Sequence, residues 1–119
     1  IDPRRTATSE GADLQLSIRP GMDSVLFSWL LVQLHARCAV DYDFVETHAT
    51  GFDEALFAAR RIAPDIETVA EKTGLSPDDI ATFVRWFIIR DKVVTCYSQG
   101  VNQSAQGSDK VNSILNCHL

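Results

Sequence analysis

The sequence lacks the clusters and short motifs by which most metal sites and covalent catalytic sites are recognised. It has only three cysteines, Cys38, Cys96 and Cys117, which lie far apart and show no C-x-x-C spacing. This pattern excludes a disulfide framework, an iron–sulfur cluster and a zinc cluster, and it is typical of a reducing cytoplasm. The sequence also has no G-x-S-x-G nucleophile elbow and neither the G-x-x-x-x-G-K-S/T nor the G-x-G-x-x-G phosphate-binding motif.

Long apolar runs and an excess of basic charge are also missing. No apolar run approaches the roughly 20 residues of a membrane-spanning helix. The 11 basic residues are outnumbered by 16 acidic residues, which gives a net charge of −5 and argues against nucleic acid or an anionic membrane as the main partner. Val69–Ser76 and the segment after it resemble a helix-turn-helix, but Asp78 and Asp79 would repel phosphate there.

The chain begins Ile-Asp-Pro-Arg, with neither an initiator methionine nor a signal-peptide pattern. We therefore expect it to be cut from a longer chain. At 119 residues it is expected to form at most one domain.

Hydrophobic patterning predicts an α/β fold. Leucine and isoleucine alternate with polar residues over Asp13–Ile18, as in a half-buried strand. Lys92–Tyr97 is apolar on both faces, as expected of a parallel strand covered by helices, and Ile1–Gly11 is interpreted as a strand end running into a polar loop. Because helical segments separate these strands, we expect a parallel sheet with helical crossovers.

The expected helices have local start and stop signals. A strongly apolar helix is predicted over Ser24–Arg37, sandwiched between the sheet and another helix. Asp41 is expected to cap the next helical segment, and Thr50 with Asp53 resembles a capping box.

Further along, Gly74 is expected to end a helix, and Ser76-Pro77-Asp78-Asp79 predicts the start of the next one. The helix that follows has a continuous apolar face made by Ile80, Phe83, Val84, Phe87 and Ile88.

The predicted site is organised around Val93–Asn116. This stretch begins with a β-branched run, continues through small and amide-bearing residues, and ends in a segment with helical periodicity. A strand, a polar turn and a helix in this order present backbone N–H groups and a helix N-terminus to a bound anion. The amide side chains suit a base or a pterin ring, whereas turn geometry alone is the competing interpretation.

Two acidic residues each allow two interpretations. Asp2 could bind ribose hydroxyls just beyond a strand end, or Asp2 and Pro3 could simply form a turn. Asp23 could cap the following helix, or its carboxylate could accept two parallel hydrogen bonds from the N1–H and 2-amino groups of guanine. Arg4 and Arg5 are candidates for phosphate binding or for stacking on a base, or are solvated surface residues.

Three stretches carry a family resemblance: IDPRRT, then ADLQLSIRPGMD, then GVNQSAQGSDKVNSILNCHL. In this order and spacing they resemble one domain of the large catalytic subunit of molybdopterin oxidoreductases of the dimethyl-sulfoxide-reductase type. The resemblance is strongest at the two ends of the chain and only general between Asp41 and Arg90. The run YSQGVNQSAQGSDKVNSILNCHL is most similar to assimilatory nitrate reductases, and formate dehydrogenases share the IDPR and G-V-x-Q elements.

The resemblance implies an incomplete, Rossmann-like fragment that holds one molybdopterin guanine dinucleotide at its strand ends, over residues 1–119. It favours the nucleotide interpretation of Asp23. Gln99 stands where many relatives have methionine. The cofactor-binding residues that it implies are Asp2, Pro3, Arg4, Arg5, Thr6, Gly21, Met22, Asp23, Gln99, Gly100, Val101, Asn102 and Gln103.

The resemblance also implies an activity and partners for the full-length subunit. That subunit would reduce nitrate to nitrite in the cytoplasm at a molybdenum centre carrying bis-molybdopterin guanine dinucleotide. The molybdenum ligand and a 4Fe–4S cluster would lie outside this chain, which would be inactive alone. Its partners would be the remainder of the subunit, an electron donor and, through an exposed sheet edge, other copies of itself. Formate oxidation is the near alternative, and a stand-alone binding or regulatory domain is the more distant one.

Overall fold

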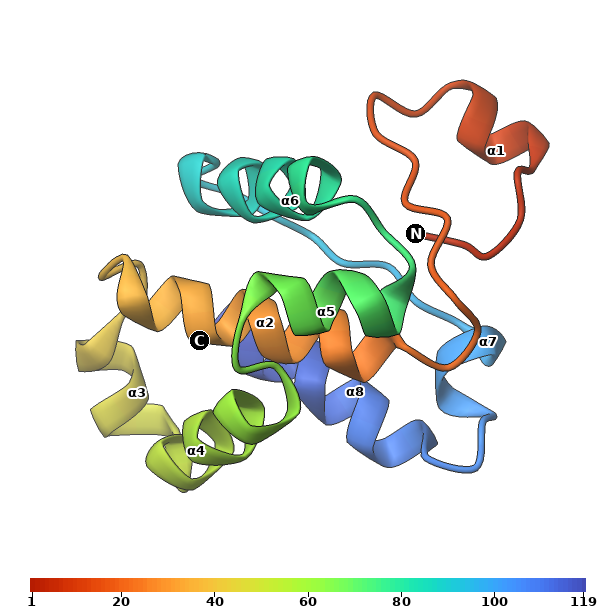
Figure 1. The fold of residues 1–119 in the computed structure, drawn as a ribbon. Coiled ribbons are helices and arrows are strands. Elements are labelled where there is room, and N and C mark those ends of the chain that lie inside the picture. The colour runs from red at the N-terminus through yellow and green to blue at the C-terminus, as the bar shows by residue number, and fades with distance from the viewer.

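A central helix, α2 (Asp23–Ala36), organises the computed structural model, which describes all residues from 1 to 119. Helices make up 61% of the chain, and no strand is present. The other elements, in chain order, are α1 (Ala7–Glu10), α3 (Tyr42–His48), α4 (Phe52–Ile62), α5 (Ile66–Thr73), α6 (Pro77–Ile89), α7 (Gln99–Asn102), α8 (Gly107–Leu115) and the 3-10 turn η1 (Asn116–His118) (Figure 1).

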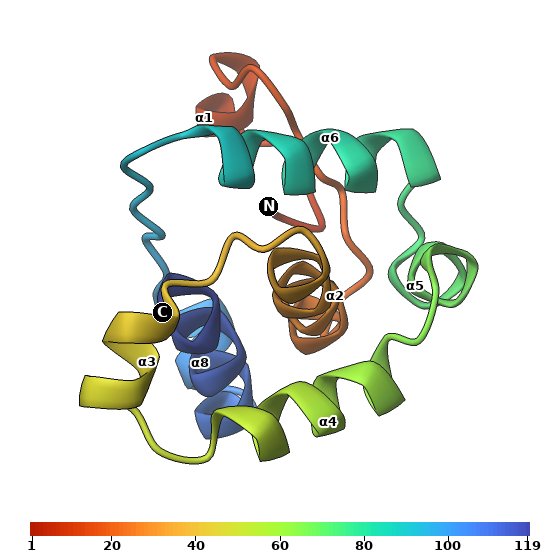
Figure 2. The ribbon, with the colours of Figure 1, turned by 90° about the vertical axis from the view of Figure 1, so that its left-hand side faces the viewer.

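Helix α2 is surrounded by other helices. Figure 2 looks nearly along α2 and shows α4, α5, α6 and α8 arranged around it. Its apolar residues face in several directions, and those that are buried are Val25, Leu26, Phe27, Leu30, Leu31 and Leu34. Because a helix that is apolar all round must be covered all round, the prediction of a buried helix here is confirmed. The covering elements are helices, however, and not a sheet.

Several predicted helix boundaries are confirmed. The Asp41 carboxylate accepts the backbone N–H of Phe44 at 2.9 Å, and the Ser76 hydroxyl accepts that of Asp79 at 3.1 Å. Gly74 ends α5 in the left-handed conformation, with φ of 76°. In each case one residue satisfies backbone groups that the helix itself leaves free.

Two predicted helix starts are wrong. Helix α4 begins after Gly51, whose φ is 78°, so Thr50 and Asp53 do not form the predicted capping box. Met22 occupies the N-cap position of α2, and no side chain caps that helix. The capping interpretation of Asp23 is therefore wrong, because Asp23 is already the first helical residue.

The predicted α/β fold with a Rossmann-like parallel sheet is wrong. Asp13–Ile18 and Lys92–Tyr97 are largely extended, but they are not joined by a ladder of backbone hydrogen bonds. The backbone of Val93–Tyr97 makes no backbone hydrogen bond at all, and Val94 is 84% exposed rather than covered. β-branched residues favour an extended backbone, but a sheet also requires a neighbouring strand, and in this chain the helices pack around α2 instead.

The alternation of apolar and polar residues over Asp13–Ile18 nevertheless predicts correctly which side chains of this segment are buried. Leu16 and Ile18 are fully buried against α2, α5 and α6. The N-terminal segment is attached to it, because the N–H of Asp2 donates to the carbonyl of Leu16 at 3.1 Å. At the other end of the chain, a hydrogen bond of 2.8 Å joins the side chains of Thr95 and His118. These contacts hold both extended segments against the helices.

None of the helices combines the length and the apolar character that crossing a bilayer would require.

The three thiols are expected to react at very different rates. Cys38 and Cys96 are exposed, whereas Cys117 is buried and donates to the carbonyl of Phe27 at 3.2 Å. Burial raises the pKa of Cys117 to about 12, and the thiolate is the reactive form. At about pH 8, a chromogenic disulfide reagent should therefore label two thiols of the folded chain quickly and the third only in denaturant.

The same pKa shift predicts a loss of stability in alkali. Between about pH 9 and pH 12 the Cys117 thiol ionises in the unfolded chain but not in the folded one. The unfolded state then binds fewer protons, so the free energy of unfolding falls as the pH rises through this window. Urea titrations at increasing pH measure this trend, and rapid labelling of all three thiols in the folded chain would contradict the assignment.

Candidate functional site

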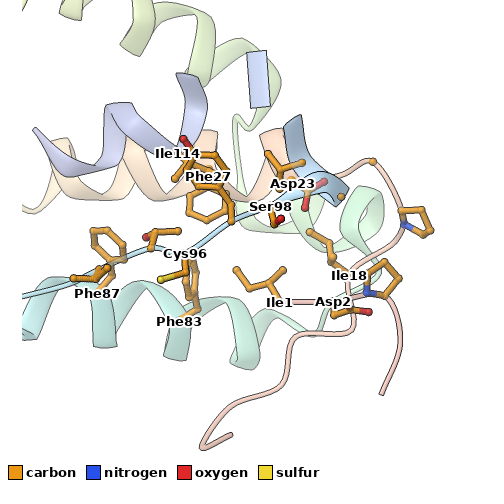
Figure 3. A pocket seen from close by; sticks show the side chains of 18 of the residues that line it. Ile1, Asp2, Ile18, Asp23, Phe27, Phe83, Phe87, Cys96, Ser98 and Ile114 are labelled. Atoms are coloured by element: carbon orange, nitrogen blue, oxygen red, sulfur yellow. The ribbon is translucent and has the colours of Figure 1, made fainter. Parts of the chain in front are cut away.

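A cleft of about 700 Å³ lies between the N-terminal segment, the start of α2, α6, and the extended segment that leads into α7 (Figure 3). This size is within the range of small-molecule and cofactor sites. Eleven of its 20 lining residues are hydrophobic, so a ligand here would bury much apolar surface while meeting a few polar groups.

The cleft has an aromatic end and a polar end. Phe27 and Phe83 meet edge to face with ring centroids 6.0 Å apart, and Phe87 lies 6.3 Å from Phe83. Figure 3 shows these three rings toward one end, while Asp23 and Asp2 lie toward the other. A planar ring system with hydrogen-bonding groups along one edge matches this division, because its faces are apolar and its edge is not.

Asp23 is the most tightly held polar group at the cleft. Its Oδ2 atom lies 3.1 Å from Nζ of Lys110 in α8, and the two side chains are 20% and 6% exposed, respectively. A buried ammonium needs a counter-charge of this kind, so the ion pair joins the start of α2 to α8. The second oxygen, Oδ1, has no partner in the chain, and Asp23 lines the cleft. This carboxylate can therefore still accept a hydrogen bond from a ligand.

Asp2 has a local structural role as well as a position at the cleft. Its Oδ1 atom accepts the backbone N–H of Arg4 at 2.7 Å and lies 3.7 Å from Nε of the same residue. The carboxylate thus forms the turn that was one of the two interpretations of Asp2-Pro3. Asp2 also lines the cleft, so the turn places it beside the space in which a ligand would lie.

The turn between α7 and α8 is shaped by a close backbone approach. A Cβ atom at Gly107 would overlap the carbonyl group of Asn102, so only glycine fits where α8 begins. This contact holds α7 against the start of α8, and Gly100 and Val101 of α7 line the cleft.

The thirteen predicted cofactor-binding residues are only partly brought together. Seven line the cleft: Asp2, Pro3, Arg4, Gly21, Asp23, Gly100 and Val101. The other six do not: Arg5 and Thr6 border a separate polar hollow, Met22 packs against the buried core, and Gln99, Asn102 and Gln103 are exposed on or next to α7. A cofactor-binding role for any of the thirteen stays a prediction.

Sequence reasoning missed two features of this site. Phe83 and Phe87 were assigned to the apolar face of a helix, and the structure places both at the cleft. Lys110 was given no role, although it lies on the helical stripe that contains Gly107, Ile114 and Cys117, all of them buried. A charged side chain within a buried stripe requires a counter-charge. The position of Lys110 on this stripe could therefore have indicated an ion pair with an acidic residue such as Asp23.

The histidines and acidic groups form no second chemical centre. His35 hydrogen-bonds to the Tyr42 hydroxyl at 2.6 Å, and His118 to Thr95. No group of three or more His, Cys, Asp or Glu side chains lies close enough together to hold a metal ion.

No family model matches the chain, but individual relatives match it over its whole length. It is 39% identical to a nitrate reductase from Shewanella frigidimarina and 44% identical to one from Klebsiella oxytoca, each over 119 residues. It is 31% identical to the assimilatory nitrate reductase catalytic subunit of Bacillus subtilis. The chain spans only 13% of the length of the first two relatives and 16% of the third.

More distant relatives and a solved structure agree with these matches. The chain is 25% identical to the alpha subunit of an F420-dependent formate dehydrogenase from Methanocaldococcus jannaschii. Its fold superposes on acetylene hydratase from Pelobacter acetylenicus with a TM-score of 0.84 and 25% identity, covering 98% of this chain and 16% of that one. The chain is therefore similar over its whole length to one segment of the nitrate reductases, and it shares the fold of the matching segment of acetylene hydratase, a molybdopterin enzyme.

Proposed function

We propose that the chain contributes part of the binding site for a molybdopterin guanine dinucleotide in the catalytic subunit of an assimilatory nitrate reductase. One observation carries the proposal. Residues from three separate stretches, represented by Asp2, Asp23 and Gly100, line the same cleft. The match to nitrate reductases along all 119 residues supports the choice of enzyme.

The residues at the cleft fit one half of such a cofactor. Phe27, Phe83 and Phe87 offer an apolar aromatic surface for a ring system. At the other end, the Asp23 carboxylate can accept hydrogen bonds from the N–H groups along the edge of guanine. Arg4 lines the cleft and is otherwise exposed, so its charge is available to a phosphate.

In this proposal the chain binds and orients, and the reaction takes place elsewhere. The molybdenum cofactor would supply, when bound, the redox chemistry by which nitrate, two electrons and two protons give nitrite and water. Asp23 would hold the nucleotide end by its edge, and the three phenylalanines would exclude water from one face of the cleft. The molybdenum ligand, a 4Fe–4S cluster and the site of the electron donor belong to the remainder of the catalytic subunit.

The same relatives support an expectation about the setting of the full-length subunit. Nitrate assimilation in the cytoplasm suits the assimilatory enzymes to which the chain is similar, and three free cysteines suit a reducing compartment. The sheet edge from which self-association was predicted is absent. Self-association of the isolated chain stays a prediction, for which the exposed apolar side chains of Ile89 and Val94 are the remaining basis.

Formate oxidation is the second candidate, and the similarity to formate dehydrogenase alpha subunits favours it. The two activities are separated by assaying the full-length subunit that contains this sequence. Nitrate should oxidise a reduced viologen dye in its presence, and formate should not reduce the oxidised dye. Formate-dependent dye reduction without nitrate turnover would replace the proposed reaction while leaving the cofactor proposal in place.

The cofactor proposal is tested by titrating the 119-residue chain with GMP and following backbone N–H signals by NMR. Weak binding is expected, with a Kd of about 1 mM, because only part of a dinucleotide is offered. Signals of Asp2, Gly21 and Asp23 should move together, and AMP is the matched control because it differs only in the base. Shifts confined to other surfaces, or equal shifts with AMP, would overturn the proposal.

A further inference from the structure

The geometry of the ion pair between Lys110 and Asp23 affects which ligands the cleft can bind. Lys110 does not line the cleft, whereas Asp23 does. The ammonium therefore contacts the carboxylate from the side of α8, through Oδ2 at 3.1 Å, and Oδ1 is left without a partner in the chain. With its side chain only 6% exposed, Lys110 has little freedom to leave this position.

The charges of Asp23 and Lys110 determine which ligands can bind at this end of the cleft. A lone carboxylate at a cleft attracts cations, such as an amine or a guanidinium group. Asp23 paired with Lys110 is neutral as a unit, yet the carboxylate still offers only acceptor atoms. Such a group suits an uncharged ring edge that carries N–H donors, because no net charge has to be buried with the ligand.

We infer that Lys110 is a positioning residue that holds Asp23 and sets the preference of the cleft for a neutral, donor-bearing base edge such as that of guanine. This inference rests on the proposed function and adds a specificity determinant to it. Lys110 itself touches no ligand in this scheme. It acts by fixing one carboxylate oxygen and by cancelling the charge of Asp23.

Three nucleotides with the same phosphate test the inference. GMP offers two adjacent donors at its base edge, IMP offers one, and AMP offers an acceptor at the corresponding ring nitrogen. Affinities are measured for the wild-type chain, for Lys110→Met, which keeps the length of the side chain without its charge, and for Lys110→Arg, which keeps the charge. The wild-type chain should prefer GMP over IMP and IMP over AMP.

The preference for GMP over AMP should fall by about tenfold in Lys110→Met, as expected when hydrogen bonds to a well-placed carboxylate weaken. It should be largely retained in Lys110→Arg, a rescue that loss of folding alone would not produce. An unchanged preference in a folded Lys110→Met chain overturns the inference and leaves the proposed function intact. Failure of the wild-type chain to prefer GMP overturns the proposed function itself.

A measurement on the wild-type chain covers the case in which Lys110→Met does not fold, as judged by circular dichroism. The NMR signals of the Asp23 carboxyl carbon and of the Lys110 ammonium nitrogen are followed as GMP is added. Both should shift with the same midpoint as the backbone signals of the cleft. GMP binding that leaves both signals unmoved overturns the role of Lys110.

Discussion

Removing the Asp23 carboxylate is expected to lower the free energy of unfolding of the chain by about 3–5 kcal/mol. The variant Asp23→Ala leaves the ammonium of Lys110 without its counter-charge, in a side chain that is only 6% exposed. An uncompensated buried charge costs far more than the loss of a surface ion pair. Chemical denaturation followed by circular dichroism measures the change.

A second acidic residue provides the matched control. Asp109 also lies in the first turn of a helix, α8, but it is exposed. Asp109→Ala therefore removes a comparable interaction with the helix dipole, and should cost no more than about 1 kcal/mol. The double variant Asp23→Ala/Lys110→Met should recover most of the lost stability, because it removes the unpaired charge as well. Similar costs for Asp23→Ala and Asp109→Ala would show that the pair is not buried as described.

Leu30→Ala is expected to lower the free energy of unfolding by about 3–4 kcal/mol. Leu30 is in the middle of α2, has 0% of its surface exposed, and packs within the cluster that joins α2 to α4, α6 and α8. Because three helices pack around it, the cavity left by truncation cannot collapse easily, and this raises the cost above that of the lost burial alone.

The control for this variant uses the same chemical change at the surface. Leu115 ends α8 and is 51% exposed, so Leu115→Ala should cost about 1 kcal/mol or less. Denaturant midpoints of the two variants, measured side by side, give the comparison. Equal losses of stability would contradict the central position of α2.

Much of the helical structure was predictable because its signals are local. Ser76 and Gly74 satisfy backbone groups within their own helix ends, so a window of a few residues contains the whole interaction. The failed capping box at Thr50 shows the limit of this reasoning. Gly51 adopts a left-handed conformation there, and the chain enters α4 by a different turn.

The sheet was predicted wrongly because strand formation is not a local property. Val93–Tyr97 has the β-branched composition of a buried strand, and its backbone is largely extended. Whether an extended segment becomes a strand depends on a partner distant in sequence, and neither the composition nor the alternation of a segment identifies that partner. The helices that follow were expected to cross over a sheet, and in the structure they pack on α2.

The site was only partly predictable for a related reason. Asp23 could be singled out from its place before an apolar helix and from the family resemblance. Its pairing with Lys110 could not, because the two residues are separated by most of the chain and meet only where α8 packs on α2. The position of Phe83 and Phe87 at the cleft could not be predicted either. A phenylalanine on the apolar face of a helix occurs at the same sequence spacing whether it faces the core or a ligand site.

The sequence by itself determined several helix boundaries, which helix is the most deeply buried, and the family to which the chain is similar. These properties depend on hydrophobic periodicity, on capping residues and on short runs of identity, all of which are contained in neighbouring residues. Only the tertiary structure decided that the extended segments form no sheet and that six of the thirteen predicted residues lie away from the cleft. It also decided that Lys110 forms an ion pair with Asp23. Those outcomes depend on which distant surfaces pack together, and packing is selected by the burial of the whole chain rather than by any one stretch of it.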